Sequence, residues 1–349
     1  MEEFTEKILD ISFDKDKIIR ILNKKEIEEI RKKWTISFIF KLRRKFKIFL
    51  LNLLNFFSFD KDIVYVNDRS LEKVKNKYDN ISGSYIKNYL DSNKKFIAQI
   101  NNNQVVELRG SKEDYYSKYL NNIIIKTNSK SFLEVGAGEL TLAADIIKNL
   151  KKYFLDYTGA LDLSLNRLIA GNEFLKKQNL NIDFVVNGDA SNLPFPDNSF
   201  DIVYTSHCLE QVPHLFLKAV NECSRVAKKY VVLIEPSYEL GSEVTKNHIY
   251  KKGYIKITSK LLKKLELSVV FRKILPIKIF HNGSEIIILK KDSNKKEDIK
   301  KVQFLCPSCK SFLIENEKKL ICKTENCYFD IISTIPKLTI SDKKKYEKR

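Results

Sequence analysis

The sequence lacks any uninterrupted apolar run of about 18 residues, the length that a membrane-spanning helix requires. Its N-terminus is acidic, at Glu2 and Glu3, and lacks the basic-then-apolar order of a secretory signal. Cysteine is scarce, with 6 among 349 residues. Most of these cysteines crowd into the last stretch of the chain, which favours metal binding in a reducing compartment over a disulfide framework. We therefore expect a cytoplasmic protein.

The overall composition is that of a folded chain. Hydrophobic residues make up 43% and charged residues 31%, which excludes a disordered or fibrous protein. The length suits one main domain with smaller attachments. The formal net charge of +19 favours a polyanionic partner such as RNA or an anionic membrane surface. Lysine is abundant throughout, so compositional bias is the competing explanation.

The most hydrophobic stretch, residues 34–59, belongs to an N-terminal region, residues 1–70, that we predict to be basic and helical. Basic residues interrupt this stretch: Lys41, Arg43, Arg44, Lys45 and Lys47. As a helix it would have a broad apolar face beside a polar side. Such a helix suits peripheral contact with the inner face of a membrane, and it equally suits docking on the main domain.

From residue 131 onward, short β-branched runs alternate with helical stretches. Strands that alternate with helices predict an α/β fold, here a doubly wound, mostly parallel, seven-stranded sheet with right-handed crossovers. The last two runs lie close together in sequence, so we expect them to pair antiparallel at an edge. The seven runs are residues 131–135, 157–163, 182–187, 200–206, 230–235, 268–275 and 285–289.

The first of these runs leads into a glycine turn, Glu134-x-Gly136-x-Gly138. Glycines there let the backbone approach a nucleotide-like ligand closely. Acidic residues beside the turn disfavour a pyrophosphate, and the third glycine of a dinucleotide motif is missing, so a cationic cofactor such as S-adenosylmethionine fits better. Asp162 ends the second strand, where it can accept the ribose hydroxyls or cap the next helix.

Taken in order, these motifs resemble those of class I methyltransferases, particularly the broad type 11 group. The motifs are Glu134-x-Gly136-x-Gly138, Asp162, Gly188-Asp189-Ala190, Leu193-Pro194-Phe195 and Phe200-Asp201. The resemblance implies a Rossmann-like methyltransferase domain over residues 71–290 that binds S-adenosylmethionine. It also implies that Asp189 or the Ala190 backbone contacts adenine and that Leu193 lies in the adenine pocket. Leu140 stands where many members have a third glycine, a departure that would narrow the pocket.

Residues that follow the fourth strand should lie beside the bound ligand. His207 is the best single candidate for a catalytic base, because imidazole can take a proton near neutral pH; the alternative is a structural histidine. Upstream, the segment from Tyr78 to Tyr85 resembles one that covers the cofactor in small-molecule methyltransferases. We expect a small-molecule or sugar-containing acceptor. The alternatives are an RNA methyltransferase and a non-catalytic scaffold with the methyltransferase fold.

Two cysteine pairs near the end of the chain predict a structural zinc site, because four thiolates can close tetrahedrally around Zn²⁺. They are Cys306 and Cys309, then Cys322 and Cys327. We expect a zinc ribbon over residues 302–340, joined to the sheet domain by a charged linker over residues 291–301 and followed by a basic tail over residues 341–349. This ribbon resembles small zinc-ribbon proteins that partner some methyltransferases. Loss of its zinc should leave cofactor binding on the sheet domain largely intact.

Overall fold

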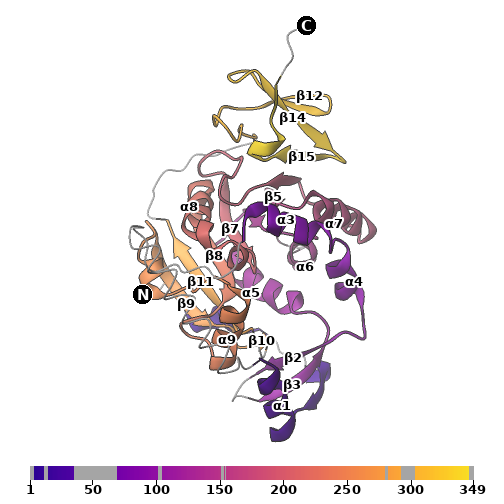
Figure 1. Ribbon diagram of the computed structural model, residues 1–349, viewed down its shortest axis with the longest axis vertical. Coiled ribbons are helices and arrows are strands. Elements are labelled where there is room, and N and C mark those ends of the chain that lie inside the picture. The colour runs from indigo at the N-terminus through magenta and orange to yellow at the C-terminus, as the bar shows by residue number, and fades with distance from the viewer. Residues whose placement is uncertain are drawn as a thin grey trace.

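The computed structural model describes residues 4–11, 15–34, 69–100, 104–150, 153, 155–279, 282–291 and 303–345 (Figure 1). The hydrophobic stretch 34–59 lies outside these residues except for Trp34, the last residue of α1 (Lys24–Trp34). Most of the charged linker and the last four residues of the basic tail also lie outside them. Among the helices that the structure describes, none is both long enough and apolar enough to cross a membrane.

A central sheet carries the fold. Within the described residues its seven strands lie in the order β6-β5-β4-β7-β8-β11-β9. The first five are parallel, and β11 runs antiparallel to both β8 and β9. The prediction of a mostly parallel sheet with an antiparallel edge is therefore confirmed. In sequence order the strands are β4 (Ser131–Val135), β5 (Tyr157–Asp162), β6 (Phe184–Gly188), β7 (Phe200–Ser206), β8 (Ala227–Pro236), β9 (Ser268–Ile274) and β11 (Ser284–Lys290).

Helices cover both faces of this sheet, as the alternation of buried side chains along the strands requires. Leu133 of β4 and Val231 of β8 pack with α8 (Phe216–Val226). Phe132 and Val232, their neighbours in the chain, instead pack with α5 (Glu113–Lys126) and α6 (Thr141–Asn149). The other helices that follow strands are α7 (Leu165–Lys177), α9 (Glu243–Lys252) and α10 (Ser259–Leu262).

Two further groups of elements surround this core. A small antiparallel sheet in the order β1-β3-β2-β10 comprises β1 (Ile18–Ile21), β3 (Val105–Arg109), β2 (Lys95–Gln99) and β10 (Lys278–Ile279). The sequence did not predict this sheet, and β1 lies in the region expected to be helical. Helices α3 (Leu71–Asp79) and α4 (Ser84–Leu90) lie between β1 and β2 in the sequence. Short 3₁₀ helices are η1 (Glu6–Leu9), η2 (Lys15–Lys17), η4 (Leu209–Gln211), η5 (Pro213–Leu215) and η6 (Ile340–Asp342).

The cysteine tail, residues 303–345, forms the antiparallel unit at the top of Figure 1. Its strands are β12 (Ile314–Asn316), β13 (Lys319–Cys322), β14 (Cys327–Ile332), β15 (Ile335–Leu338) and β16 (Lys344–Lys345). Strand β15 pairs in parallel with β6, so that Lys337 lies opposite Asn187 and Leu338 opposite Gly188. The tail is thus an extension of the central sheet, although a charged linker separates the two in sequence.

Candidate functional site

The glycine turn after β4 has the backbone that its residues predict. Gly136 and Gly138 have positive φ angles of 79° and 56°, and a Cβ at Gly136 would overlap the Cys208 side chain. Leu140 also has a positive φ of 60°, a conformation that favours glycine. The Leu140 side chain is fully buried with Ala144 and Leu168 and does not line the cavity. The departure at Leu140 therefore does not narrow the pocket.

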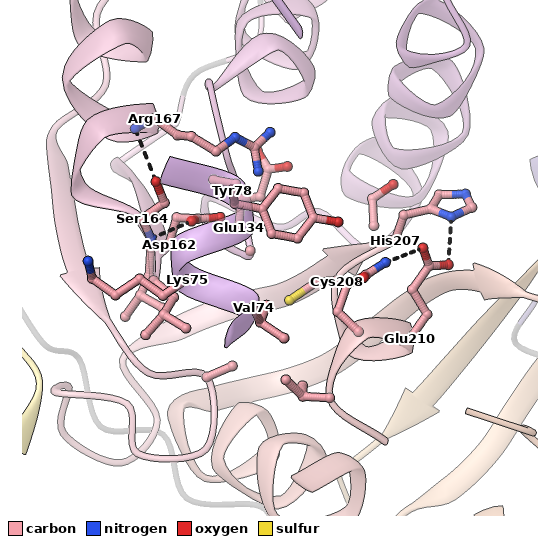
Figure 2. A pocket seen from close by; sticks show the side chains of 18 of the residues that line it. Val74, Lys75, Tyr78, Glu134, Asp162, Ser164, Arg167, His207, Cys208 and Glu210 are labelled. Atoms are coloured by element: carbon pink, nitrogen blue, oxygen red, sulfur yellow. Dashed lines mark hydrogen bonds and ion pairs between the residues drawn. The ribbon is translucent and has the colours of Figure 1, made fainter. Parts of the chain in front are cut away.

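A cavity of about 310 Å³ opens over this turn, and Figure 2 shows the side chains that line it. Asp162 lies at its floor, where one carboxylate oxygen accepts a hydrogen bond from the Gly138 N–H and the other from the Ser164 N–H, each at 2.8 Å. The carboxylate therefore fixes the glycine turn and the start of α7 together. Each oxygen keeps a second lone pair for a ligand hydroxyl.

Glu134 lines the same cavity and is 3% exposed. The Tyr204 hydroxyl donates a hydrogen bond to its carboxyl group at 3.1 Å. Burial raises the pKa of Glu134 to about 8, and the nearby charge of Asp162 adds to the shift. Without a cation beside it, Glu134 is therefore mostly protonated at neutral pH, and a cation there would favour its ionised form.

Glu139, the second acidic residue beside the glycine turn, binds backbone N–H groups at the start of α4. Its carboxylate oxygens accept hydrogen bonds from the Gly83 N–H at 3.1 Å and the Ile86 N–H at 2.7 Å. It also lies 3.5 Å from the Arg167 guanidinium. Glu139 thus attaches the start of α4 to the glycine turn.

The predicted covering segment does lie over the cavity. Figure 2 shows the Tyr78 side chain reaching between Glu134 and His207. The Arg167 guanidinium lies 5.0 Å from the centroid of the Tyr78 ring and 4.5 Å from that of Tyr85. The Ser164 hydroxyl donates to the Asp79 carboxylate. Helix α3 is therefore held over the end of the cavity that Asp162 lines.

The residues after β6 divide between the cavity and the core. Asp189 and Ala190 line the cavity, and the Asp189 carboxylate accepts hydrogen bonds from the Ser191 N–H and hydroxyl. Leu193 does not line it: its side chain is fully buried in the core, and its N–H donates to Glu222 at 2.8 Å. The structure therefore brings Asp189 and Ala190 to the site but not the Leu193 side chain.

The opposite end of the cavity is formed by the turn after β7. His207 Nδ1 lies 3.0 Å from a Glu210 carboxylate oxygen, and His207 Nε2 lies 3.2 Å from the Tyr116 hydroxyl and 3.0 Å from the Ser284 hydroxyl. Burial, and then the charge of Lys112, lowers the pKa of His207 well below its ordinary value. His207 is therefore neutral near pH 7.

Glu235, at the end of β8, fixes the shape of this turn. It is fully buried and accepts hydrogen bonds from the N–H groups of Cys208, Leu209 and Glu210 and from the Thr205 hydroxyl. Burial, and then the charge of Glu210, raises the pKa of Glu235 to about 8. Its role is to hold the backbone that presents His207 and Glu210.

Two lining residues at this end were missed in the sequence. Lys112 stands just before α5. Burial lowers the pKa of its ammonium group, but the interactions with Tyr116, Glu113, Tyr85 and Glu210 outweigh burial and leave the pKa raised. Asn282 is 9% exposed, and its side-chain oxygen has no hydrogen-bond partner among the described residues. Neither residue stands in a motif. Lys112 reaches the cavity because α5 packs against the sheet, and Asn282 reaches it because β11 pairs with β8.

The tail brings its cysteines together. The sulfurs of Cys306, Cys322 and Cys327 lie within 4.8 Å of one another, and Cys309 Sγ lies 3.5 Å from Cys322 Sγ. Sulfurs bound tetrahedrally at about 2.3 Å from a zinc ion lie about 3.8 Å apart, so this spacing fits zinc. All but Cys309 are buried.

The middle of the chain matches a known protein family. The family model for a methyltransferase domain matches residues 133–234, which include the glycine turn, Asp162 and the His207–Glu210 turn. The chain therefore contains a region that matches a methyltransferase domain. The matched residues span the five parallel strands, from within β4 to within β8.

Curated relatives match parts of the chain. The demethylmenaquinone methyltransferase of Staphylococcus haemolyticus is 37% identical over 109 residues, which are 30% of this chain and 44% of that protein. The demethylmenaquinone methyltransferase of Anoxybacillus flavithermus is 40% identical over 79 residues, 22% of this chain and 33% of that protein. The chain thus matches less than half the length of these relatives.

Among solved structures, magnesium protoporphyrin IX methyltransferase from Synechocystis, with bound S-adenosylmethionine, has a TM-score of 0.43 and 10% identity. That similarity covers 65% of this chain and 99% of the Synechocystis chain.

Proposed function

We propose that the protein is an S-adenosylmethionine-dependent methyltransferase that acts on a small molecule or a sugar-containing biosynthetic intermediate. The observation that carries this proposal is a single cavity with the glycine turn at one end and the polar His207–Glu210 turn at the other. Helix α3 lies over the cavity, which favours an acceptor that fits inside it over a polymer. The relatives named for demethylmenaquinone support a small acceptor.

The cofactor would lie over the glycine turn. Gly136 and Gly138 would admit it closely, Asp162 would accept its ribose hydroxyls, and Glu134 would face one of its cationic groups. Asp189 and the Ala190 backbone would lie beside adenine. Leu140 does not line the cavity, so nothing about that residue favours a non-catalytic scaffold.

Methyl transfer is an in-line displacement at a carbon that the sulfonium already activates, so most of the catalysis comes from alignment of the acceptor. Where the acceptor must lose a proton, a base beside it is also needed. The hydrogen-bonded pair of His207 and Glu210 would supply this base, because it lies at the end of the cavity away from Asp162 (Figure 2).

The tail would hold one structural Zn²⁺ through Cys306, Cys309, Cys322 and Cys327. Four protein ligands leave no position for water or substrate on the ion, so its role would be to fold the tail.

Calorimetric binding of S-adenosylhomocysteine, the reaction product, tests the assigned pocket. Asp162→Ala should weaken binding by about 100-fold, because it removes a charged hydrogen-bond acceptor and two backbone attachments. Gly136→Val should abolish binding, since its side chain would overlap Cys208. Glu173→Gln, an exposed change on α7, is the control and should bind normally. Normal affinity in both site variants would refute the pocket.

A further inference from the structure

The structure also bears on which atom removes the acceptor's proton, a question that rests on the proposed function. We infer that Glu210, rather than His207, accepts this proton, and that His207 is a positioning residue that holds the Glu210 carboxylate at the cavity wall. The acceptor is then a small molecule whose nucleophile is an ionisable O–H or N–H group.

His207 has no lone pair available for a substrate. Its Nδ1 lies 3.0 Å from Glu210, which in the ionised form that acts as a base can only accept, so Nδ1 then carries the proton and Nε2 is the ring's acceptor. That Nε2 already lies within hydrogen-bond distance of the Tyr116 and Ser284 hydroxyls, which also lie 3.0 Å from each other. The ring thus donates to Glu210 on one side and accepts from a hydroxyl on the other.

Glu210, in contrast to His207, keeps lone pairs that a substrate could reach. It lines the cavity and is 4% exposed. One carboxylate oxygen accepts from Gln211 Nε2 at 2.7 Å and the other from His207 Nδ1 at 3.0 Å. Each oxygen therefore keeps a lone pair. Its backbone is fixed because the Glu210 N–H donates to Glu235.

The charges around Glu210 keep it able to exchange a proton near neutral pH. Burial raises its pKa to about 7, while Lys112, the Gln211 hydrogen bond, Arg69 and Lys77 oppose a larger rise. The other titratable groups that interact with Glu210 include Glu235, Tyr116, Cys208, Tyr78, Tyr254 and His207. A base with a pKa near the working pH is the most effective kind.

The step balances without any further reactant. The Glu210 carboxylate takes the proton from the acceptor's O–H or N–H, and the lone pair left on that atom forms a bond to the methyl carbon. The carbon–sulfur bond breaks, and its electron pair stays on sulfur, which turns the sulfonium into the neutral thioether of S-adenosylhomocysteine. Glu210 ends protonated.

The test measures transfer of labelled methyl groups from S-adenosylmethionine to a low-molecular-mass extract of the native cells, as a function of pH. Glu210→Gln should lower the rate at saturating extract by about 100-fold, and Glu210→Asp should restore part of it. His207→Asn should lower the rate by only about 10-fold and move the pH midpoint upward, since Glu210 loses a hydrogen bond to its ionised form. Glu243→Gln, exposed on α9, is the matched control and should behave as wild type.

The affinity for S-adenosylhomocysteine, measured in parallel, distinguishes failure of the Glu210 inference from failure of the methyltransferase proposal. The inference is overturned if Glu210→Gln keeps the wild-type rate and pH profile, or if His207→Asn loses about 100-fold while Glu210→Gln does not. A wild-type protein that neither binds S-adenosylhomocysteine nor transfers label would instead refute the methyltransferase proposal, and this inference with it.

Discussion

Leu338, in the tail, lies opposite Gly188 at the end of β6, one residue before Asp189. The next residues along the chain are held by the tail as well. The Asn192 side chain donates to the Pro307 carbonyl at 3.0 Å, and the Leu305 N–H donates to the Pro194 carbonyl at 3.0 Å. The segment proposed to lie beside adenine is therefore packed against the folded tail.

This contact changes the expectation that zinc loss leaves cofactor binding intact. We predict that a chelator lowers the affinity for S-adenosylhomocysteine by about 10-fold, a typical coupling between linked sites, because an unfolded tail would release residues 188–194. Calorimetry before chelation, after it and after zinc is returned measures the effect. Unchanged affinity in protein shown to have lost its zinc would mean that β6 holds this segment without the tail.

The tail itself should contain about one zinc per chain. Cys322→Ser should lose the metal, because Cys322 Sγ lies within 4.8 Å of the Cys306 and Cys327 sulfurs and 3.5 Å from Cys309 Sγ. Cys223→Ser is the control: Cys223 is also buried, but it lies in α8 and outside the group. Metal analysis of reduced protein decides the matter, and zinc retained in Cys322→Ser at the wild-type level would contradict the assigned ligands.

Binding of S-adenosylmethionine should release protons below pH 8. Glu134 has a pKa raised to about 8 in the empty cavity, so it is protonated at pH 7 and must ionise to face a cationic group. Affinity should therefore rise as the pH approaches 8 and level off above it. Calorimetry at pH 7 in buffers of different ionisation enthalpy should find up to about one proton released per cofactor.

Glu134→Gln should remove this proton release. If the variant releases as many protons as wild type, other groups supply those protons, and Glu134 is not the carboxyl group that faces the cation.

The same pKa has the opposite consequence for the stability of the empty protein. The pKa of folded Glu134 lies above its ordinary 4.5, so the stability linked to its protonation is present below about pH 4.5 and is lost as the pH rises through 8. Relative to Glu134→Gln, the unfolding temperature of wild type should therefore fall between about pH 4.5 and 8 and level off above pH 8. A parallel pH dependence in the two proteins would show that Glu134 is ionised in the empty cavity.

The central sheet was predictable because its strands are runs of β-branched residues that stand clear of the helical stretches. The small sheet was not, since β1 and β10 are short and their pairing partners β3 and β2 lie far away in sequence. Parallel pairing of β15 with β6 likewise joins residues about 150 apart, and no local pattern encodes such a contact.

The cavity-lining residues near the glycine turn could largely be predicted from the sequence, and those at the opposite end could not. Glycines and carboxylates at strand ends identified Gly136, Asp162 and Asp189, because the topology alone brings strand ends together. Lys112 and Asn282 reach the cavity only because α5 packs on the sheet and because the residues just before β11 lie beside the cavity. Leu193 shows the converse, as a motif residue whose side chain the fold turns into the core.

The most direct measurement of the central claim follows a labelled methyl group from S-adenosylmethionine into a whole-cell extract, fractionated by molecular mass after RNase treatment. The account predicts label in the low-molecular-mass fraction, unaffected by RNase and absent with Asp162→Ala. Label confined to RNA and lost after RNase would show that the protein methylates RNA, and no transfer at all to any fraction would contradict the methyltransferase proposal.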